Sequence, residues 1–157
     1  MINDNFLSLA PLMGQFWNDL SQIVTFKIKV KMPTYLETSE KEELIEEIEE
    51  KGIIWGVVTN KPKYLAEKIF EKFDWHKRTE ILICPQDVFD KRKPDPSSLN
   101  KAIEDGGFNA EQSIYVGDNW RDSEASVNAK TNFAYADYGY GKKNSIKTEN
   151  LQIILES

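Results

Sequence analysis

Residues 53–62 read IIWGVVTNKP, an apolar run of strand length followed at once by a polar turn that ends in proline. A continuous apolar run without alternation is typical of a strand that is buried on both faces of a sheet. Pro62 then marks the start of a helix that carries Leu65, Ile69 and Phe73. This stretch therefore predicts a strand followed by a helix, the unit from which parallel sheets are built.

The same cycle of strand and helix repeats on both sides of this stretch. Before it, Ser39 and Glu42 form a capping-box signature, and Gly52 is a natural stop, so we expect a helix over residues 40–51. After it, we expect strands over residues 81–84, 113–116 and 132–136, and helices over residues 96–105 and 121–129. Such alternation predicts an α/β fold, a Rossmann-like parallel sheet with helices on both faces.

The N-terminal residues have a different pattern. Apolar residues recur at helical spacing over residues 5–22, which predicts an amphipathic helix. Residues 23–30 read IVTFKIKV, in which lysines alternate with apolar residues, a pattern that fits an edge strand better than one buried on both faces. We therefore divide the chain into a helical segment with a short strand, residues 1–33, and an α/β core, residues 34–157.

Composition limits the class of protein. The 157 residues are enough for one compact domain. The 20 basic and 26 acidic residues give a net charge of −6, which argues against a nucleic-acid partner. Neither a membrane span nor an export signal is indicated. Cys84, the only cysteine, reads as a structural thiol and fits a cytoplasmic protein.

Polar residues lie in the segments that follow three of the predicted strands. Thr59 and Asn60 follow the first, at the mouth of a helix whose N-terminus favours an anion. Lys93, which supplies a point charge for phosphate or carboxylate, follows the second. Asp118 and Asp122, with the hard oxygen ligands that suit Mg²⁺, follow the third. The carboxyl ends of parallel strands are where such folds bind ligands.

Each of these pieces also has a purely structural interpretation. Thr-Asn after a strand serves as a helix cap, Lys-Pro-Asp-Pro as a rigid turn, and Gly-Asp as ordinary turn chemistry. Their joint occurrence at successive strand ends is what favours a functional site. His76, the only histidine, follows a helix rather than a strand, and we expect it to be a surface residue.

Four segments together resemble the haloacid dehalogenase superfamily of phosphatases, in particular its phosphoglycolate phosphatase-like branch. They are VVTNKP at residues 57–62, DVFDKRKPDP at 87–96, YVGDNWRD at 115–122 and YGYG at 138–141. The resemblance implies a small phosphorylated metabolite as substrate and Mg²⁺ as cofactor. It also implies that Thr59 and Asn60 bind the phosphoryl group, that Lys93 neutralises its charge and orients the nucleophile, and that Asp118 binds the metal with support from Asp122.

One motif of that superfamily is absent. Its members begin with an Asp-x-Asp-x-Thr/Val motif on a central strand, and the first aspartate attacks phosphorus. Upstream of Thr59 this chain has only Asp4 and Asp19, followed two positions later by Phe6 and Ser21. A threonine hydroxyl without a base does not replace a carboxylate nucleophile. We therefore expect this chain to be inactive or weak as an enzyme.

The missing motif also predicts a gap in the middle of the sheet, an incomplete core, because its strand lies between the two that precede Thr59 and Asp118. Unpaired strand edges need partners. Residues 23–30 are the best local candidate to fill it, and the alternatives are a second copy of the chain in a homo-oligomer or the N-terminal helix. Lys130, where the superfamily usually has glycine, is a smaller departure that affects a turn.

Three interpretations follow from the sequence. The first is a phosphatase-family chain whose complete form hydrolyses a small phosphomonoester, with residues 1–33 as a remnant of a helical cap domain and the chain a truncated product or fragment. The second is a non-catalytic module that binds phosphate or another anion, or that serves as an assembly partner. The third, a receiver-like domain, lacks the early phosphorylatable aspartate and acidic cluster that it needs.

Overall fold

The computed structural model describes residues 23–24, 45–46, 48–136, 146 and 153–155. The predicted helix over residues 5–22, the interpretation of residues 1–33 as a cap remnant, and the capping box at Ser39 and Glu42 lie outside the described residues. Structural statements below concern the described part of the chain. None of its helices is long and apolar enough to cross a membrane.

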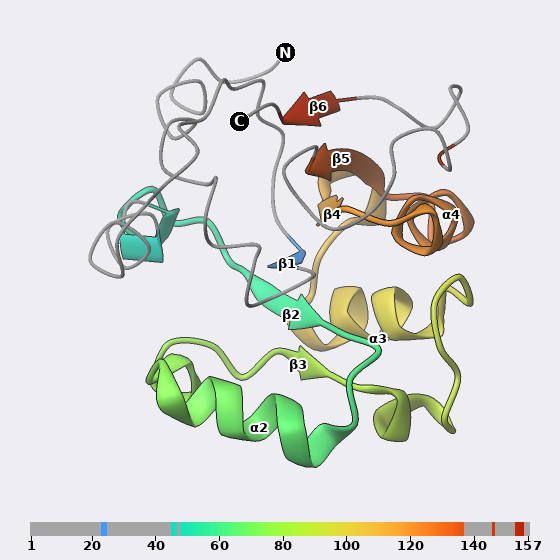
Figure 1. Cartoon of the computed structure of the whole chain (residues 1–157). Coiled ribbons are helices and arrows are strands. Elements are labelled where there is room, and N and C mark those ends of the chain that lie inside the picture. The colour runs from blue at the N-terminus through green and yellow to red at the C-terminus, as the bar shows by residue number, and fades with distance from the viewer. Residues whose placement is uncertain (1–22, 25–44, 47, 137–145, 147–152, 156–157) are drawn as a thin grey trace.

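Strands and helices alternate as the sequence predicts (Figure 1). In chain order the elements are β1 (Ile23–Val24), β2 (Gly56–Val58), α2 (Lys63–Lys72), β3 (Leu82–Ile83), α3 (Ser97–Gly106), β4 (Ile114–Gly117), α4 (Trp120–Asn128), β5 (Asn132–Ala136) and β6 (Ile153–Leu155), with short 3₁₀ turns η3 (Trp75–Lys77), η4 (Pro85–Val88) and η5 (Ala110–Gln112). Residues 45–46 and 48–50 are also helical and stop before Gly52, as expected. The sequence did not indicate β6.

Strand β1 occupies the centre of the sheet. The strand order within the described residues is β3-β2-β1-β4-β5-β6. β1 is antiparallel to both neighbours, with Ile23 opposite Val57 and Val116. The other strand pairs are parallel. Residues 23–24 thus fill the predicted gap, and the prediction that this segment fits an edge strand is wrong for them. The two strand residues, Ile23 and Val24, are apolar and precede the first lysine of the alternating run. The lysines therefore do not indicate whether these two residues lie at the edge or in the centre of the sheet.

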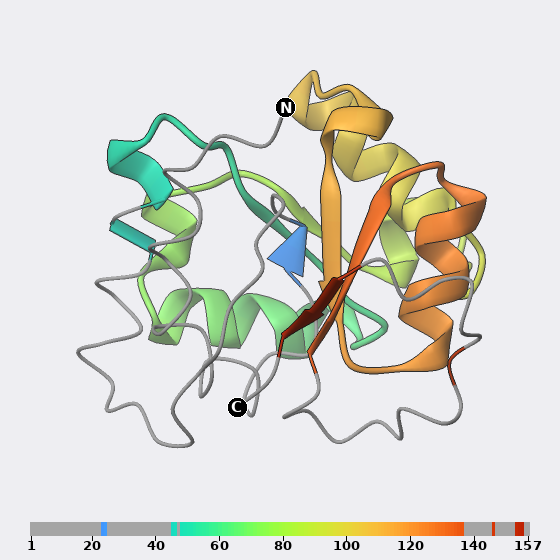
Figure 2. The same cartoon turned by 90° about the horizontal axis from the view of Figure 1, so that it is seen from above.

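Helices cover both faces of the sheet, which confirms the predicted α/β architecture. Figure 2 shows α2 on one side of the strands and α3 and α4 on the other. The core lies between the strands and α3 and α4 and is made of aliphatic and aromatic side chains (Val58, Ile81, Ile83, Val88, Leu99, Ala102, Tyr115, Ala125, Ala129, Phe133, Tyr135 and Ile146). Burial of this set is the main stabilising contribution to the fold.

The predicted apolar stripe of α2 is shifted by one residue. Ala66 and Phe70 are the buried members of the helix, whereas Leu65 is exposed. Two other predictions are confirmed. Cys84 is fully buried, and burial raises the pKa of its thiol to about 11, so it is an inert structural residue. His76 is exposed.

Lys130 has a left-handed backbone conformation, with φ of 58°, just after α4 ends. A residue with a β-carbon is disfavoured there and glycine is not. We expect Lys130→Gly to raise the free energy of unfolding by about 1 kcal/mol. Urea denaturation monitored by tryptophan fluorescence measures the change. Lys68→Gly, the same substitution inside exposed helix α2, is the control and should lose about 1 kcal/mol; a similar loss at Lys130 would contradict the conformational explanation.

Candidate functional site

The five predicted site residues converge at one edge of the sheet. Thr59 directly follows β2, Asp118 directly follows β4, and Asp122 lies in the first turn of α4. Lys93 comes from the loop between η4 and α3 and reaches the same place, because its ammonium lies 3.2 Å from Asp122 Oδ1. The edge where β2, β3 and β4 end therefore assembles the residues that the sequence placed at successive strand ends.

Asn60 fixes the loop that carries Lys93. Its Oδ1 accepts a hydrogen bond from the backbone N–H of Lys93 at 3.0 Å, and its Nδ2 donates to the Lys93 carbonyl at 3.3 Å. Thr59 makes a turn of its own, since its Oγ1 accepts from the backbone N–H of Lys61 at 3.1 Å. A hydroxyl that accepts one hydrogen bond still carries a hydrogen of its own to donate. Thr59 and Asn60 therefore have structural roles in fixing turns and loops. A ligand contact from the Thr59 hydroxyl is compatible with these roles.

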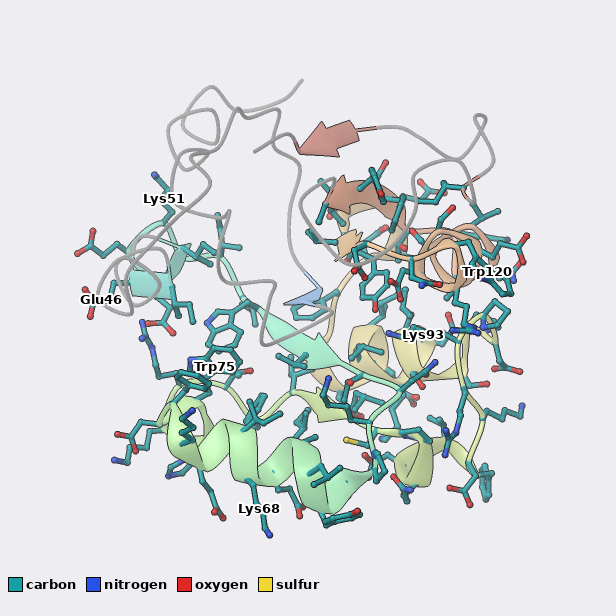
Figure 3. The ribbon with its side chains drawn as sticks, viewed as in Figure 1. Glu46, Lys51, Lys68, Trp75, Lys93 and Trp120 are labelled. Carbon is teal, nitrogen blue, oxygen red and sulfur yellow. The ribbon has the colours of Figure 1, made fainter. Side chains whose placement is uncertain are left out.

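The side chain of Lys93 extends into the interior of the molecule and is fully buried (Figure 3). Its Nζ donates to Tyr115 Oη at 2.6 Å and to the Val58 carbonyl at 3.3 Å, and it forms the ion pair with Asp122. An ammonium has three hydrogens. These three acceptors satisfy them, so Lys93 would have to exchange a partner to contact a phosphate.

Asp122 is bound on both of its oxygens. Oδ1 faces Lys93, and Oδ2 accepts from the backbone N–H of Asn119 at 3.0 Å as one half of a capping box at the start of α4. The strand end approaches this carboxylate closely. A β-carbon added at Gly117 would lie 2.5 Å from Asp122 Cβ and 2.7 Å from Oδ2. Glycine at that position is therefore required for Asp122 to sit under the end of β4.

Burial dominates the electrostatics of this pair. It lowers the pKa of Lys93 to about 8, although Asp122 and Asp118 act in the opposite direction. It raises the pKa of Asp122, although Lys93 opposes this and Asp118 adds to it. The influence of Asp118 on both groups shows that its carboxylate, itself almost buried, is near enough to act on the pair. The site thus has two carboxylates around one buried cation.

Sequence reasoning missed the role of Tyr115. This residue is fully buried in β4, and its hydroxyl contacts Lys93, Asp122 and the Val58 carbonyl. A tyrosine inside an otherwise apolar strand is a signal in itself, because a buried hydroxyl needs a hydrogen-bonding partner. The residue lies in the quoted segment YVGDNWRD but had no assigned function there.

The described residues contain no group of three or more His, Cys, Asp or Glu side chains arranged to hold a metal ion. Both oxygens of Asp122 are bound to protein donors, and Asp118 directly follows β4 at the same edge of the sheet. Mg²⁺ takes only one or two protein carboxylates and keeps several waters. These two carboxylates are therefore compatible with a weakly held, largely hydrated Mg²⁺.

Several known proteins with similar sequences or folds are described as phosphatases. An N-acetylmuramic acid 6-phosphate phosphatase of Pseudomonas aeruginosa is 41% identical over 98 residues, 62% of this chain and 43% of that protein. A phosphoglycolate phosphatase of Xanthomonas campestris is 39% identical over 99 residues, 63% of this chain and 44% of that protein. A crystal structure described as a predicted phosphoglycolate phosphatase from Haemophilus somnus matches with a TM-score of 0.64 and 25% identity, over 73% of this chain and 50% of that one.

The match therefore spans less than half the length of either of these two curated relatives. A family model matches more of this chain. Residues 12–136 match the model described as haloacid dehalogenase-like hydrolase. That range includes Thr59, Lys93 and Asp118 and the strands that position them. By sequence and by fold, the chain belongs to the haloacid dehalogenase-like hydrolases.

Proposed function

We propose that this chain carries the phosphate-binding and Mg²⁺-binding part of a phosphatase whose complete form hydrolyses a small phosphomonoester such as phosphoglycolate in the cytoplasm. Thr59 and Asn60 bind the phosphoryl group, Lys93 neutralises its charge, and Asp118 holds Mg²⁺ with Asp122 as support. The proposal is supported by the convergence of these residues at one edge of the sheet and by the two phosphatase relatives.

Each side chain has a definite task in this proposal. The hydroxyl hydrogen of Thr59 is donated to a phosphoryl oxygen, while Lys61 keeps its lone pair occupied. Asn60 positions Lys93 through the backbone of the lysine loop. Asp122 holds the ammonium of Lys93 in its charged form. When bound at Asp118, Mg²⁺ would neutralise charge on the phosphoryl oxygens.

As it stands, the chain is inactive or weak, and the direction of β1 is the observation that carries this part of the proposal. Because β1 is antiparallel to β2 and β4, its carboxyl end lies at the edge opposite Thr59 and Asp118. The sequence also has no Asp-x-Asp pair upstream of Thr59. Within the part of the chain that the structure describes, the carboxyl end of the central strand therefore brings no carboxylate nucleophile to the edge where the phosphoryl group would bind.

Hydrolysis assays test this. We expect purified, folded protein to hydrolyse p-nitrophenyl phosphate and phosphoglycolate no faster with Mg²⁺ than with a chelator, and Asp118→Asn to behave identically. Asp74→Asn, which changes an exposed carboxylate beyond α2, is the control. Chelator-sensitive turnover that disappears in Asp118→Asn but not in Asp74→Asn would disprove inactivity. Asp4 and Asp19 would then be the next residues to replace.

The alternative is a non-catalytic module that binds phosphate or another anion or assists assembly. The closed network around Lys93 favours the assembly role, because all three hydrogens of its ammonium are satisfied within the protein and need no ligand. Calorimetric titration with phosphate and phosphoglycolate, with and without Mg²⁺, separates the interpretations. Binding that needs no Mg²⁺ supports the module, and binding that needs Mg²⁺ supports the phosphatase remnant.

Thr59→Val tests the phosphate contact directly. Loss of one hydrogen bond to a charged ligand costs about 1.5–3 kcal/mol, so we expect phosphate affinity to fall about tenfold or more in the same titration. The folded state loses the Lys61–Thr59 turn bond as well, and urea denaturation measures that loss separately. Unchanged affinity in a folded variant would remove Thr59 from the proposed site.

A further inference from the structure

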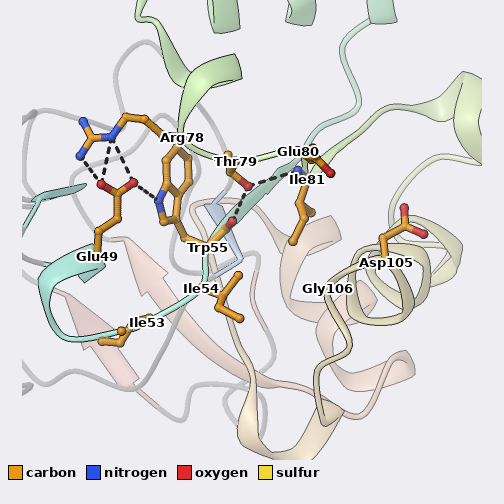
Figure 4. Close-up of a pocket in the computed structure, with 11 residues that line it drawn as sticks. Glu49, Ile53, Ile54, Trp55, Arg78, Thr79, Glu80, Ile81, Asp105 and Gly106 are labelled. Carbon is orange, nitrogen blue, oxygen red and sulfur yellow. Dashed lines mark hydrogen bonds and ion pairs between the residues drawn. The ribbon is translucent and has the colours of Figure 1, made fainter.

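A hollow lies at the edge of the sheet opposite the candidate site. It has a volume of about 490 Å³ and is formed by the segments that lead into β2 and β3 and by the carboxyl end of α3 (Figure 4). Small-molecule and side-chain pockets commonly begin at about 300 Å³, so the hollow has room for a bulky side chain. Its lining residues are Glu49, Gly52, Ile53, Ile54, Trp55, Arg78, Thr79, Glu80, Ile81, Asp105 and Gly106.

One wall of the hollow is polar but satisfied internally. Glu49 accepts from Trp55 Nε1 at 2.9 Å and pairs with Arg78 Nη2 at 2.7 Å, as Figure 4 shows. The charges of Glu49 and Arg78 therefore cancel. Ile54, by contrast, is 55% exposed to solvent. The surface of the hollow that a bound group can contact is therefore the apolar side chain of Ile54.

The rim of the hollow is acidic. Glu80 and Asp105 are both exposed lining residues. Asp105 is paired with Lys101, which lies outside the lining set, at 3.0 Å. With this pair and the Glu49–Arg78 pair both neutral, Glu80 leaves the rim with a local net charge of −1. An apolar hollow with carboxylates at its rim complements an apolar group flanked by cations.

Such a group is present on this chain, in the loop after β3. Phe89 is 97% exposed, the highest value among the large exposed hydrophobic residues of the described part of the chain. Asp90, Lys91 and Arg92 follow it and are exposed as well. The ring is thus presented to solvent beside two cationic side chains.

The Phe89 loop is held rigidly in this arrangement. The Asp90 N–H donates to the Pro85 carbonyl at 2.8 Å, and Lys63 binds the loop from α2 through Gln86 and Asp87. Phe89 and Asp90 both have φ of 57°, in the left-handed region that disfavours residues with a β-carbon. A large apolar residue kept exposed in an unfavourable conformation points to an interaction.

We propose that the Phe89 ring of one copy of this chain inserts into the 490 Å³ hollow of a second copy, with Lys91 and Arg92 of the first against Glu80 and Asp105 of the second. The hollow lies at the amino ends of β2 and β3, because its lining residues Trp55 and Ile81 directly precede these strands, and Phe89 follows the carboxyl end of β3. The two surfaces therefore lie at opposite edges of the sheet. The contact is head-to-tail, and repeated addition builds open chains rather than closed dimers.

Sedimentation velocity over about 10 µM to 1 mM protein tests the proposal, because a small contact of this kind gives weak association. The weight-average mass of the wild type should rise above the 18.1 kDa monomer and continue to rise beyond a dimer. Phe89→Asn, which tolerates the left-handed backbone, should remain monomeric. Tyr64→Ser, which removes an exposed aromatic residue from α2, is the control and should associate as the wild type does.

A mixing experiment tests the direction of the contact. Glu80→Lys/Asp105→Lys should abolish association, whereas Glu71→Lys/Glu111→Lys, with the same change in net charge on exposed residues elsewhere, should not. Each defective variant retains one intact surface, so an equimolar mixture of Phe89→Asn with Glu80→Lys/Asp105→Lys should form dimers and nothing larger. A monomeric wild type at every concentration, undiminished association of Phe89→Asn, or no dimer in the mixture would overturn the proposal.

Discussion

Replacing Lys93 with methionine is expected to lower the free energy of unfolding by about 3–5 kcal/mol at pH 7, the cost of leaving a buried charge without its partner. The side chains of Lys93 and Asp122 are both fully buried, and their charged atoms lie 3.2 Å apart. Without the ammonium, Asp122 loses the group that most lowers its pKa. The pKa of Asp122 then rises further above that of an unfolded aspartate.

This shift gives the Lys93→Met variant a distinctive pH dependence. A carboxyl whose pKa is raised on folding costs stability at high pH, and this cost shrinks as the pH falls below the folded pKa and is gone below the unfolded pKa. The deficit relative to wild type should therefore shrink as the pH is lowered from 7 toward 3.8, the ordinary pKa of aspartate. Urea denaturation at several pH values measures it.

Asp122→Asn should lose a similar amount of stability, about 3–5 kcal/mol at pH 7, with the opposite pH dependence. In the wild type the pKa of Lys93 is about 8, below the ordinary value of 10.5, and Asp122 is the group that most opposes this lowering. Removing the carboxylate lowers the pKa of Lys93 further. Because the unfolded chain then binds more protons over a wider range, stability recovers as the pH rises above the folded pKa.

The double variant Lys93→Met/Asp122→Asn should recover most of the lost stability, since replacing both members of a buried pair is often close to neutral. Lys101→Met and Asp105→Asn provide the matched cycle for an exposed pair at 3.0 Å, with an expected coupling of less than about 1 kcal/mol. Additive losses in the Lys93–Asp122 cycle, or deficits that do not depend on pH, would mean that water reaches this pair.

The sequence predicted the parallel strands because each is a short apolar run between a helix and a polar turn. The residues at each strand end were predicted for the same reason, since Thr59 and Asp118 directly follow runs that must be buried. The position of β1 was not predictable in this way. Ile23 and Val24 are too few to show a hydrophobic periodicity. Their place in the sheet is decided by the edges of β2 and β4, which are far away in the sequence.

The burial of Lys93 was also not predictable from the local sequence. The sequence indicated a cation near the strand ends, but its burial depends on contacts with distant residues. Asn60 fixes its loop through two hydrogen bonds, and the Tyr115 hydroxyl accepts a hydrogen bond from its ammonium. Lys93 was expected to face a ligand, but its ammonium is instead bound by residues of the protein. The left-handed φ of Lys130 is likewise known only from the structure. The sequence had shown only that lysine stands where the superfamily usually has glycine.

Gly117→Ala is expected to destabilise the protein by about 3 kcal/mol, at the upper end of the range for overpacking in a well-packed site. The added β-carbon would lie 2.5 Å from Asp122 Cβ, 2.7 Å from Cγ and 2.7 Å from Oδ2. Asp122 cannot move away from the added methyl group without breaking a hydrogen bond or its ion pair. Its Oδ2 is bound by the Asn119 N–H at the start of α4, and its Oδ1 is bound to Lys93.

Gly107→Ala separates the steric cause from a conformational one. Gly107 has φ of +65° and no atom within 4 Å of an added β-carbon, so its substitution costs only left-handed strain, about 1 kcal/mol. Gly117 is not among the glycines with positive φ, so strain of that kind does not contribute there.

The pH dependence distinguishes displacement of Asp122 from a general loss of packing. If the new methyl group moves the carboxylate away from Lys93, Gly117→Ala should resemble Asp122→Asn, with a deficit relative to wild type that shrinks as the pH rises toward 8, because the lysine then deprotonates in the folded variant before it does so in the folded wild type. A deficit that is the same at every pH would instead mean that β4 and α4 separate as units and keep the ion pair. A loss no larger than that of Gly107→Ala would show that the close approach of Gly117 to Asp122 is not required.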